Sequence, residues 1–139
     1  MKRILVGIDG SPEAAAAADK AADLAAATGA SLKLIYVVPP HVPPGPGAYL
    51  SGLERRDLVE GDYVPALLRE LEMRCRRPGV VIDTGTRIGP VAEALADSAE
   101  GADLVVVGHR GRGAVAQTLL GSIAKRLVQI SSRPVLVVR

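Results

Sequence analysis

The chain has 139 residues, of which 48% are hydrophobic and 23% charged, so we expect one domain, 1–139, with enough apolar residues for a core. The formal net charge is only +2 and aromatic residues make up 2%, which argues against nucleic acid as the main partner. No apolar run approaches the roughly 20 residues of a membrane helix. The first residues lack a signal-peptide pattern, so we expect a cytoplasmic protein with no membrane partner.

The first part of the chain alternates strand and helix patterns. Residues 3–8 form a continuous apolar run, typical of a strand buried on both faces of a parallel sheet. Residues 11–13, Ser-Pro-Glu, supply a capping hydroxyl, a proline at the first helical position and an acid in the first turn. They predict an alanine-rich helix over 14–27 that ends at Gly29, followed by a second strand over 31–38.

Residues 39–52 interrupt this alternation with five prolines and three glycines, which forbid regular structure. So long a loop is either a lid or partner contact or a solvated connection without a role. A helix follows from about 54 to 77, and Gly61 is a point where it could be interrupted. Its expected inner face consists of Leu58, Leu67, Leu68, Leu71 and Cys75.

Cys75 is the single cysteine of the chain, so it cannot form an internal disulfide, which suits a reducing compartment. It stands between Arg74 and Arg76, where a reactive thiol is one interpretation. We favour the other, an ordinary helix cysteine.

The second part of the chain repeats the alternation. Residues 80–84 predict a third strand, and a helix begins at 89–90 and ends at Gly101. The run 104–107 predicts a fourth strand, and 134–139 a fifth. The helix after Gly89 has an apolar face made by Val91, Ala92, Leu95 and Ala99.

Strands that alternate with helices predict an α/β fold, an open five-stranded parallel sheet with helices on both faces, of the Rossmann-like kind. Ligands of such folds bind at the carboxyl ends of the strands, where the strand order reverses. We expect the first and fourth strands to flank that point. Their ends carry Asp9 and Gly108, so the acid and the loop after Gly108 should share one crevice.

The loop that begins at Gly108 carries further glycines at Gly111 and Gly113, and a helix over 122–131 opens at Gly121. Glycines allow backbone N–H groups to approach an anion closely. The first N–H groups of a helix have no internal partner and favour negative charge. This arrangement predicts a phosphate site, and ordinary turn chemistry is the alternative.

Side chains around this loop would strengthen a phosphate site. Ser122 adds a hydroxyl donor, and Arg110 and Arg112 add positive charge. The helix that follows should bury the stripe made by Ile123, Leu127 and Ile130.

Motifs of several common enzyme classes are missing from the sequence. There is no Gly-x-x-x-x-Gly-Lys-Ser/Thr loop and no Gly-x-Ser-x-Gly elbow, and the run 108–113 lacks the third glycine of the dinucleotide pattern. His41, His109 and one cysteine are too few for a zinc site. His109 is the candidate general base near the glycine loop, and a solvent-facing loop residue is the interpretation that we favour.

The last strand, 134–139, is apolar and lies at the chain end. An open apolar edge promotes association, so this strand either closes the edge of its own sheet or pairs with a second copy. We favour pairing around a two-fold axis, which predicts a homodimer.

Four segments together resemble the universal stress protein family: 4–13, 89–94, the spacing Gly108-x2-Gly111-x9-Gly121-Ser122, and 134–139. The glycine spacing resembles the signature of the nucleotide-binding branch. The family has an open α/β sheet, similar to that of the adenine nucleotide alpha hydrolases, and commonly dimerises through its last strand. The loop 39–52 is not a family motif.

The resemblance implies ATP binding, with Mg or Mn accompanying the nucleotide. Asp9 would contact the ribose region and, through the phosphates, the divalent ion. The backbone of Val37 would meet the adenine. The remaining positions would border the ribose or cradle the phosphates: Val107, Gly108, Gly111, Gly121, Ser122 and the backbone of Ile123.

Three functions fit the sequence. The first is a dimeric, ATP-binding regulatory protein of a stress response, because a phosphate cradle is present without catalytic groups. The second is a slow ATPase or phosphotransferase. The third is a dimeric interaction module without nucleotide. Glycines at 108, 111 and 121 argue against the third, since a protein without nucleotide would not need them.

Overall fold

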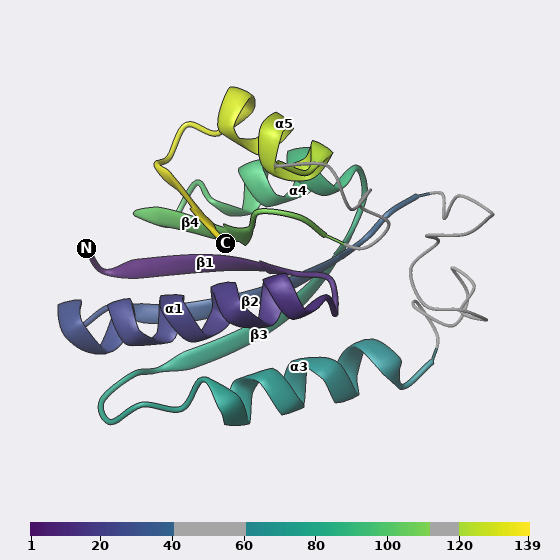
Figure 1. Ribbon diagram of the computed structural model, residues 1–139. Coiled ribbons are helices and arrows are strands. Elements are labelled where there is room, and N and C mark those ends of the chain that lie inside the picture. Colours follow the sequence, from purple (N-terminus) through teal and green to yellow (C-terminus); the bar gives the residue numbers. More distant parts are fainter. Residues whose placement is uncertain (41–60, 112–119) are drawn as a thin grey trace.

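A computed structural model describes residues 1–40, 61–111 and 120–139. Its strands form one five-stranded parallel sheet in the order β3-β2-β1-β4-β5 (Figure 1). The predicted α/β fold is therefore confirmed, and β1 and β4 flank the point where the strand order reverses. The elements are β1 (Arg3–Ile8), α1 (Pro12–Thr28), β2 (Ser31–Val38), α3 (Tyr63–Arg74), β3 (Ile82–Ile88), α4 (Val91–Ser98), β4 (Leu104–Gly108), α5 (Ser122–Ile130) and β5 (Val135–Val138).

Local signals set the ends of α1. The hydroxyl oxygen of Ser11 accepts a hydrogen bond of 3.1 Å from the N–H of Ala14, as a capping residue does. At the other end Gly29 adopts the left-handed conformation, with φ of 75°, and closes the helix. Between these residues the buried face of α1 consists of alanines, which let the helix lie close to β1 and β4.

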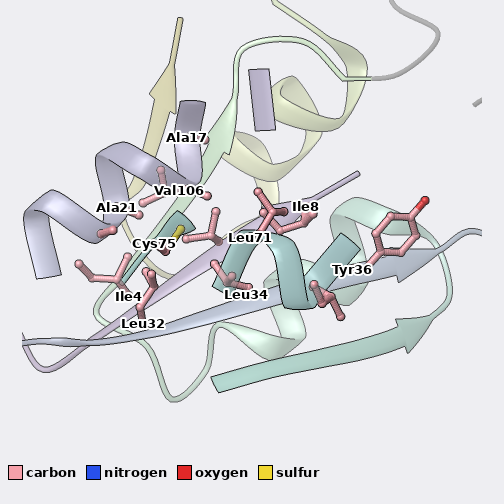
Figure 2. Packing of buried hydrophobic residues seen from close by; sticks show 14 of the residues in the cluster. Ile4, Ile8, Ala17, Ala21, Leu32, Leu34, Tyr36, Leu71, Cys75 and Val106 are labelled. Carbon is pink, nitrogen blue, oxygen red and sulfur yellow. The ribbon is translucent and has the colours of Figure 1, made fainter. Parts of the chain in front are cut away.

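Helices cover both faces of the sheet, α1 and α3 one face and α4 and α5 the other (Figure 1). Successive strand residues alternate between the two cores. Figure 2 shows the core beneath α1 and α3, in which Ile4, Ile8, Leu34 and Val106 of the sheet join Ala17 and Ala21 of α1 and Leu71 of α3. The opposite core contains Leu5, Ile35, Val37, Val105 and Val107, with Ala92, Leu95, Ala99, Ala124 and Leu127 from α4 and α5.

The third strand differs from its prediction. It runs over Ile82–Ile88 rather than 80–84 and pairs with β2 along its whole length. An edge strand is held by main-chain bonds and need not bury its side chains on both faces. Its polar second half therefore gave no apolar run for sequence analysis to detect.

The described part of the predicted helix 54–77 is α3, Tyr63–Arg74, whereas residues 54–60, including Leu58, lie outside the described residues. The predicted inner face is correct for Leu68, Leu71 and Cys75, which are buried, and Leu67 is half-buried. Most of the loop 39–52, with His41, also lies outside the described residues.

Cys75 is fully buried, and this burial raises the pKa of its thiol to about 11. A thiol that stays protonated near neutral pH is a poor nucleophile. Two ion pairs to α1 lie near it, Arg74 at the end of α3 with Asp19 at 2.5 Å and Arg77, just after the helix, with Asp23 at 2.9 Å. The ordinary buried cysteine that we favoured is what the structure contains.

The last strand, β5, pairs with β4 at the edge of the sheet, and its four residues are only half-buried. Association of this edge with a second copy remains a prediction. In residues 1–40, 61–111 and 120–139 there is no helix with the length and apolar character needed to cross a membrane.

Candidate functional site

A cavity of about 380 Å³ opens at the carboxyl ends of β1, β2 and β4, where the strand order reverses. Its volume lies within the range of about 300–1,000 Å³ that small-molecule sites occupy. Nine of the residues that the sequence singled out line it: Asp9, Val37, Val107, Gly108, Arg110, Gly111, Gly121, Ser122 and Ile123. Arg112 and Gly113 lie outside the described residues.

The turn into α1 fixes the orientation of the Asp9 carboxylate. Its Oδ1 accepts hydrogen bonds from the Ser11 N–H at 2.9 Å and from the Ser11 hydroxyl at 2.5 Å. The second oxygen, Oδ2, lies so close to Gly111 that a Cβ there would overlap it. The acid after β1 and the loop after β4 therefore share one crevice, as expected.

The glycines of this loop have packing reasons of their own. A Cβ at Gly108 would lie 2.8 Å from the Glu13 main-chain carbon in α1. A Cβ at Gly121 would lie 3.3 Å from the Arg110 Cα and 3.4 Å from the His109 carbonyl oxygen. Close packing within the chain thus accounts for these glycines without any ligand. The sequence argument that only a nucleotide-binding protein would need them was wrong.

The first turn of α5 presents main-chain N–H groups to the cavity. Gly121 is the capping residue, and its own N–H donates to the His109 carbonyl at 2.7 Å. The first main-chain bond of the helix runs from Lys125 N–H to Gly121 O, at 3.0 Å. Among the described residues none accepts from the N–H groups of Ser122, Ile123 and Ala124, which all line the cavity. These three donors are suited to an anion.

The side chain of Ile123 does not belong to the buried stripe of α5. It is 39% exposed and faces the cavity, whereas Ala124 and Leu127 are buried and Ile130 is half-buried. The stripe predicted from Ile123, Leu127 and Ile130 was therefore wrong at its first position. An apolar stripe is shifted where the helix borders a hollow rather than a core.

Hydrogen bonds hold His109 inside the loop. The main-chain N–H of His109 donates to the Val138 carbonyl oxygen at 2.7 Å, and the ring Nδ1 lies 3.3 Å from the same oxygen. Its Nε2 accepts from Arg110 Nε at 3.1 Å, which assigns the ring proton to Nδ1. The ring is half-buried and ties the loop to the end of β5, so the expectation of a solvent-facing residue was wrong. With its lone pair already in use, this ring is poorly placed as a general base.

Several residues on the cavity wall were missed as site residues, and three of them bear on ligand binding. Val91 and Leu95 of α4 line it together with Val107, and they make this side of the cavity apolar. The sequence marked Val91 and Leu95 only as core positions. Lys125 also lines the cavity, and its position three residues after Ser122 on the same helix was the available signal.

Carboxylates are scarce at this cavity, whose one acidic lining residue in the described chain is Asp9. Within the described ranges no group of three or more His, Cys, Asp or Glu side chains is arranged to hold a metal ion. A divalent ion held by Asp9 would therefore draw its other oxygen ligands from phosphate groups and water.

These features define an open parallel α/β protein with a ligand-sized cavity at the reversal of strand order. The profile of the universal stress protein family matches residues 1–139. The chain belongs to this family.

Relatives and solved structures agree with this membership. A universal stress protein of Mycolicibacterium smegmatis is 34% identical over 97% of this chain and 47% of its own length. One of Thermus aquaticus is 37% identical, over 99% of this chain and 98% of its own. The chain spans about half the length of the mycobacterial relatives that it matches.

Among solved structures, universal stress protein UspA from Lactobacillus plantarum has the same fold, with a TM-score of 0.82 at 24% identity, over 99% of this chain and 97% of that one. A universal stress protein in complex with cAMP has a TM-score of 0.75 at 30% identity, over 99% and 97% of the two chains. The Archaeoglobus fulgidus protein in complex with dAMP has 0.67 at 17% identity, over 100% and 98%. Some structural neighbours therefore hold adenine nucleotides.

Proposed function

We propose that residues 1–139 form one unit that binds ATP in the cavity between β1 and β4 and regulates a stress response. One observation carries this proposal. The N–H groups of Ser122, Ile123 and Ala124, for which the described residues supply no acceptor, open into the same cavity as Asp9 and an apolar wall. The N–H groups suit a phosphate, Asp9 suits a ribose, and the apolar wall suits a base. The solved complexes of a family member with cAMP and of another with dAMP support the choice of an adenine nucleotide.

The parts of the nucleotide have distinct places in this proposal. The base lies against Val91, Leu95 and Val107 and meets the backbone of Val37, which is one residue beyond the last β2 residue paired with β1. The ribose lies at Asp9, whose orientation Ser11 fixes. The phosphates bind at Gly111 and the start of α5, and a divalent ion such as Mg²⁺ accompanies them.

Regulation is proposed rather than catalysis. The lone pair on His109 Nε2 is used by Arg110, and Asp9 is held by the turn into α1. Neither group is placed to activate water as a general base. In the proposed dimer, the exposed edge of β5 pairs with a second copy, and bound ATP then alters which partner the dimer takes. The cytoplasm is the compartment that we propose.

The test counts nucleotide per chain in protein purified without added nucleotide, after denaturation, chromatography and mass analysis. The matched variants are Gly121→Val, whose side chain would enter the turn at the start of α5, and Gly85→Val. A Cβ at Gly85 meets nothing closer than Lys33 Cε, at 3.8 Å. Circular dichroism would verify that both variants fold.

We expect close to one ATP per chain in the unmodified protein and in Gly85→Val, and a large loss in Gly121→Val. ADP in its place would favour slow hydrolysis. An empty cavity in every preparation, with no heat and no thermal shift during ATP titration, would overturn the proposal.

A further inference from the structure

Two adjacent cations on α5 have different surroundings. Arg126 donates from Nε to Glu93 Oε1 of α4 at 3.1 Å, so its charge is compensated by a neighbouring helix. Lys125 lines the cavity instead, and no carboxylate of the described residues lies within ion-pair distance of its ammonium group. Of these neighbours, Lys125 is the one whose charge is available to a ligand.

Helix geometry directs Lys125 toward the N–H groups of the first turn of α5. Helical side chains tilt toward the helix N-terminus and cover the preceding turn. Lys125 follows Ser122 by three residues, so its aliphatic stem runs back along the first turn of α5. The side chain is exposed and lies at the rim of the cavity. A phosphate chain that starts at Ser122 and extends outward would therefore meet the ammonium group after its first phosphate.

The other cation described at the cavity is already engaged. Arg110 donates to His109 Nε2 at 3.1 Å and lies 3.8 Å from Glu13 Oε1. Glu13 compensates its charge, and the bond to His109 fixes its direction. Arg110 is thus tied to the loop and to α1, whereas Lys125 can follow a flexible anion.

We propose that Lys125 binds the outer phosphates of a nucleoside di- or triphosphate, so that the cavity selects ATP and ADP over AMP and cyclic AMP. This inference rests on the proposed function, because it concerns the same site. The helix N–H groups bind the inner phosphate in all of these ligands. Only a polyphosphate reaches the rim, and there a charge-assisted hydrogen bond to Lys125 adds affinity.

The test is calorimetric titration of ATP, ADP and AMP into the unmodified chain, Lys125→Met, Lys125→Arg and the control Arg126→Met. Methionine keeps most of the stem and removes the charge. We expect Lys125→Met to weaken ATP and ADP binding about tenfold, the size of one hydrogen bond to a charged group, and to leave AMP binding nearly unchanged. Lys125→Arg should retain the preference for ATP, and Arg126→Met should behave like the unmodified chain.

Other outcomes separate the two proposals. If the unmodified chain binds none of the three nucleotides, the proposed function fails. Suppose that the unmodified chain binds them, but that Lys125→Met lowers the affinities for ATP and AMP equally or changes neither affinity. The role of Lys125 is then overturned, while the nucleotide site stands. The same holds if Arg126→Met loses as much ATP affinity as Lys125→Met.

Discussion

Two cavities of about 380 Å³ lie at opposite ends of the same sheet. The first is the candidate site, at the carboxyl ends of β1 and β4. The second lies at the amino ends of the strands and is lined by residues such as Arg3, Ser31 and Ala102. Because they have equal volumes, size does not separate a binding site from a hollow in the surface.

The direction of the main chain distinguishes the two cavities. Each connecting helix runs antiparallel to its neighbouring strands, so helix N-termini face the first cavity and helix C-termini the second. The start of α5 brings N–H groups to the first, whereas the end of α4, near Ser98, reaches the second. Beside the second cavity Lys33 forms an ion pair with Asp83 at 3.6 Å. The helix N-termini therefore give an anionic ligand a reason to bind at the first cavity.

The largest expected difference between the two ends of the sheet is a loss of stability on substitution of Gly108. A Cβ there would lie between 2.8 and 3.0 Å from Glu13 atoms, most of them main chain, so Gly108→Val should lower the free energy of unfolding by about 3 kcal/mol. Urea unfolding would measure this. The control at the opposite cavity is Gly101→Ala, whose Cβ would meet only the flexible Arg3 guanidinium at 3.4 Å. Equal losses of unfolding free energy in both variants would show that the packing around Gly108 is no closer than the packing around Gly101.

An intermediate effect is expected at Asp9. Asp9→Ala removes the carboxylate from the cavity and should weaken ATP binding about tenfold, the size of one charge-assisted contact. It should also lower stability by about 1 kcal/mol, because Ser11 loses its acceptor. Asp83→Ala is the matched acid at the other cavity and should change neither quantity appreciably. Equal calorimetric affinities in the two variants would contradict the assignment of the site.

The smallest effect is a pH dependence at the amino end of the sheet. Asp103 accepts hydrogen bonds from the N–H groups of Lys2 at 2.7 Å and Arg3 at 2.9 Å, which lower its pKa below the ordinary 3.8. A lowered pKa in the folded state contributes stability above the unfolded-state value, and this contribution is lost as the pH falls through the folded-state value. Asp103→Asn should therefore lose less stability than the unmodified chain between neutral pH and pH values below 3.8.

Thermal unfolding across this pH range would measure the difference, with ATP binding at neutral pH as the second readout. We expect that binding to be unchanged, since Asp103 does not line the first cavity. A parallel acid dependence in both proteins would show that Asp103 is not the group responsible.

Sequence patterns predicted the part of the site that comes from strand ends. Asp9 and Gly108 follow apolar runs, and parallel topology then required both ends to meet at one edge. The prediction wrongly put the Ile123 side chain in the buried stripe of α5, and it omitted Lys125 as a site residue. Whether a helical side chain faces a core or a hollow depends on what packs opposite it, and α4 supplies that neighbour from a distant part of the chain.

The sequence by itself determined the elements whose signals are local. β1 and β2 begin and end where their apolar runs do, and α1 lies between a serine cap and a left-handed glycine because these residues act on their own turns. Only the tertiary structure decided the full length of β3, which main-chain pairing with β2 defines. It also decided the packing reason for Gly108, which depends on contact with Glu13, a residue far away in the sequence. The availability of Lys125 depends likewise on the spatial arrangement, in which no carboxylate of the described residues lies within ion-pair distance.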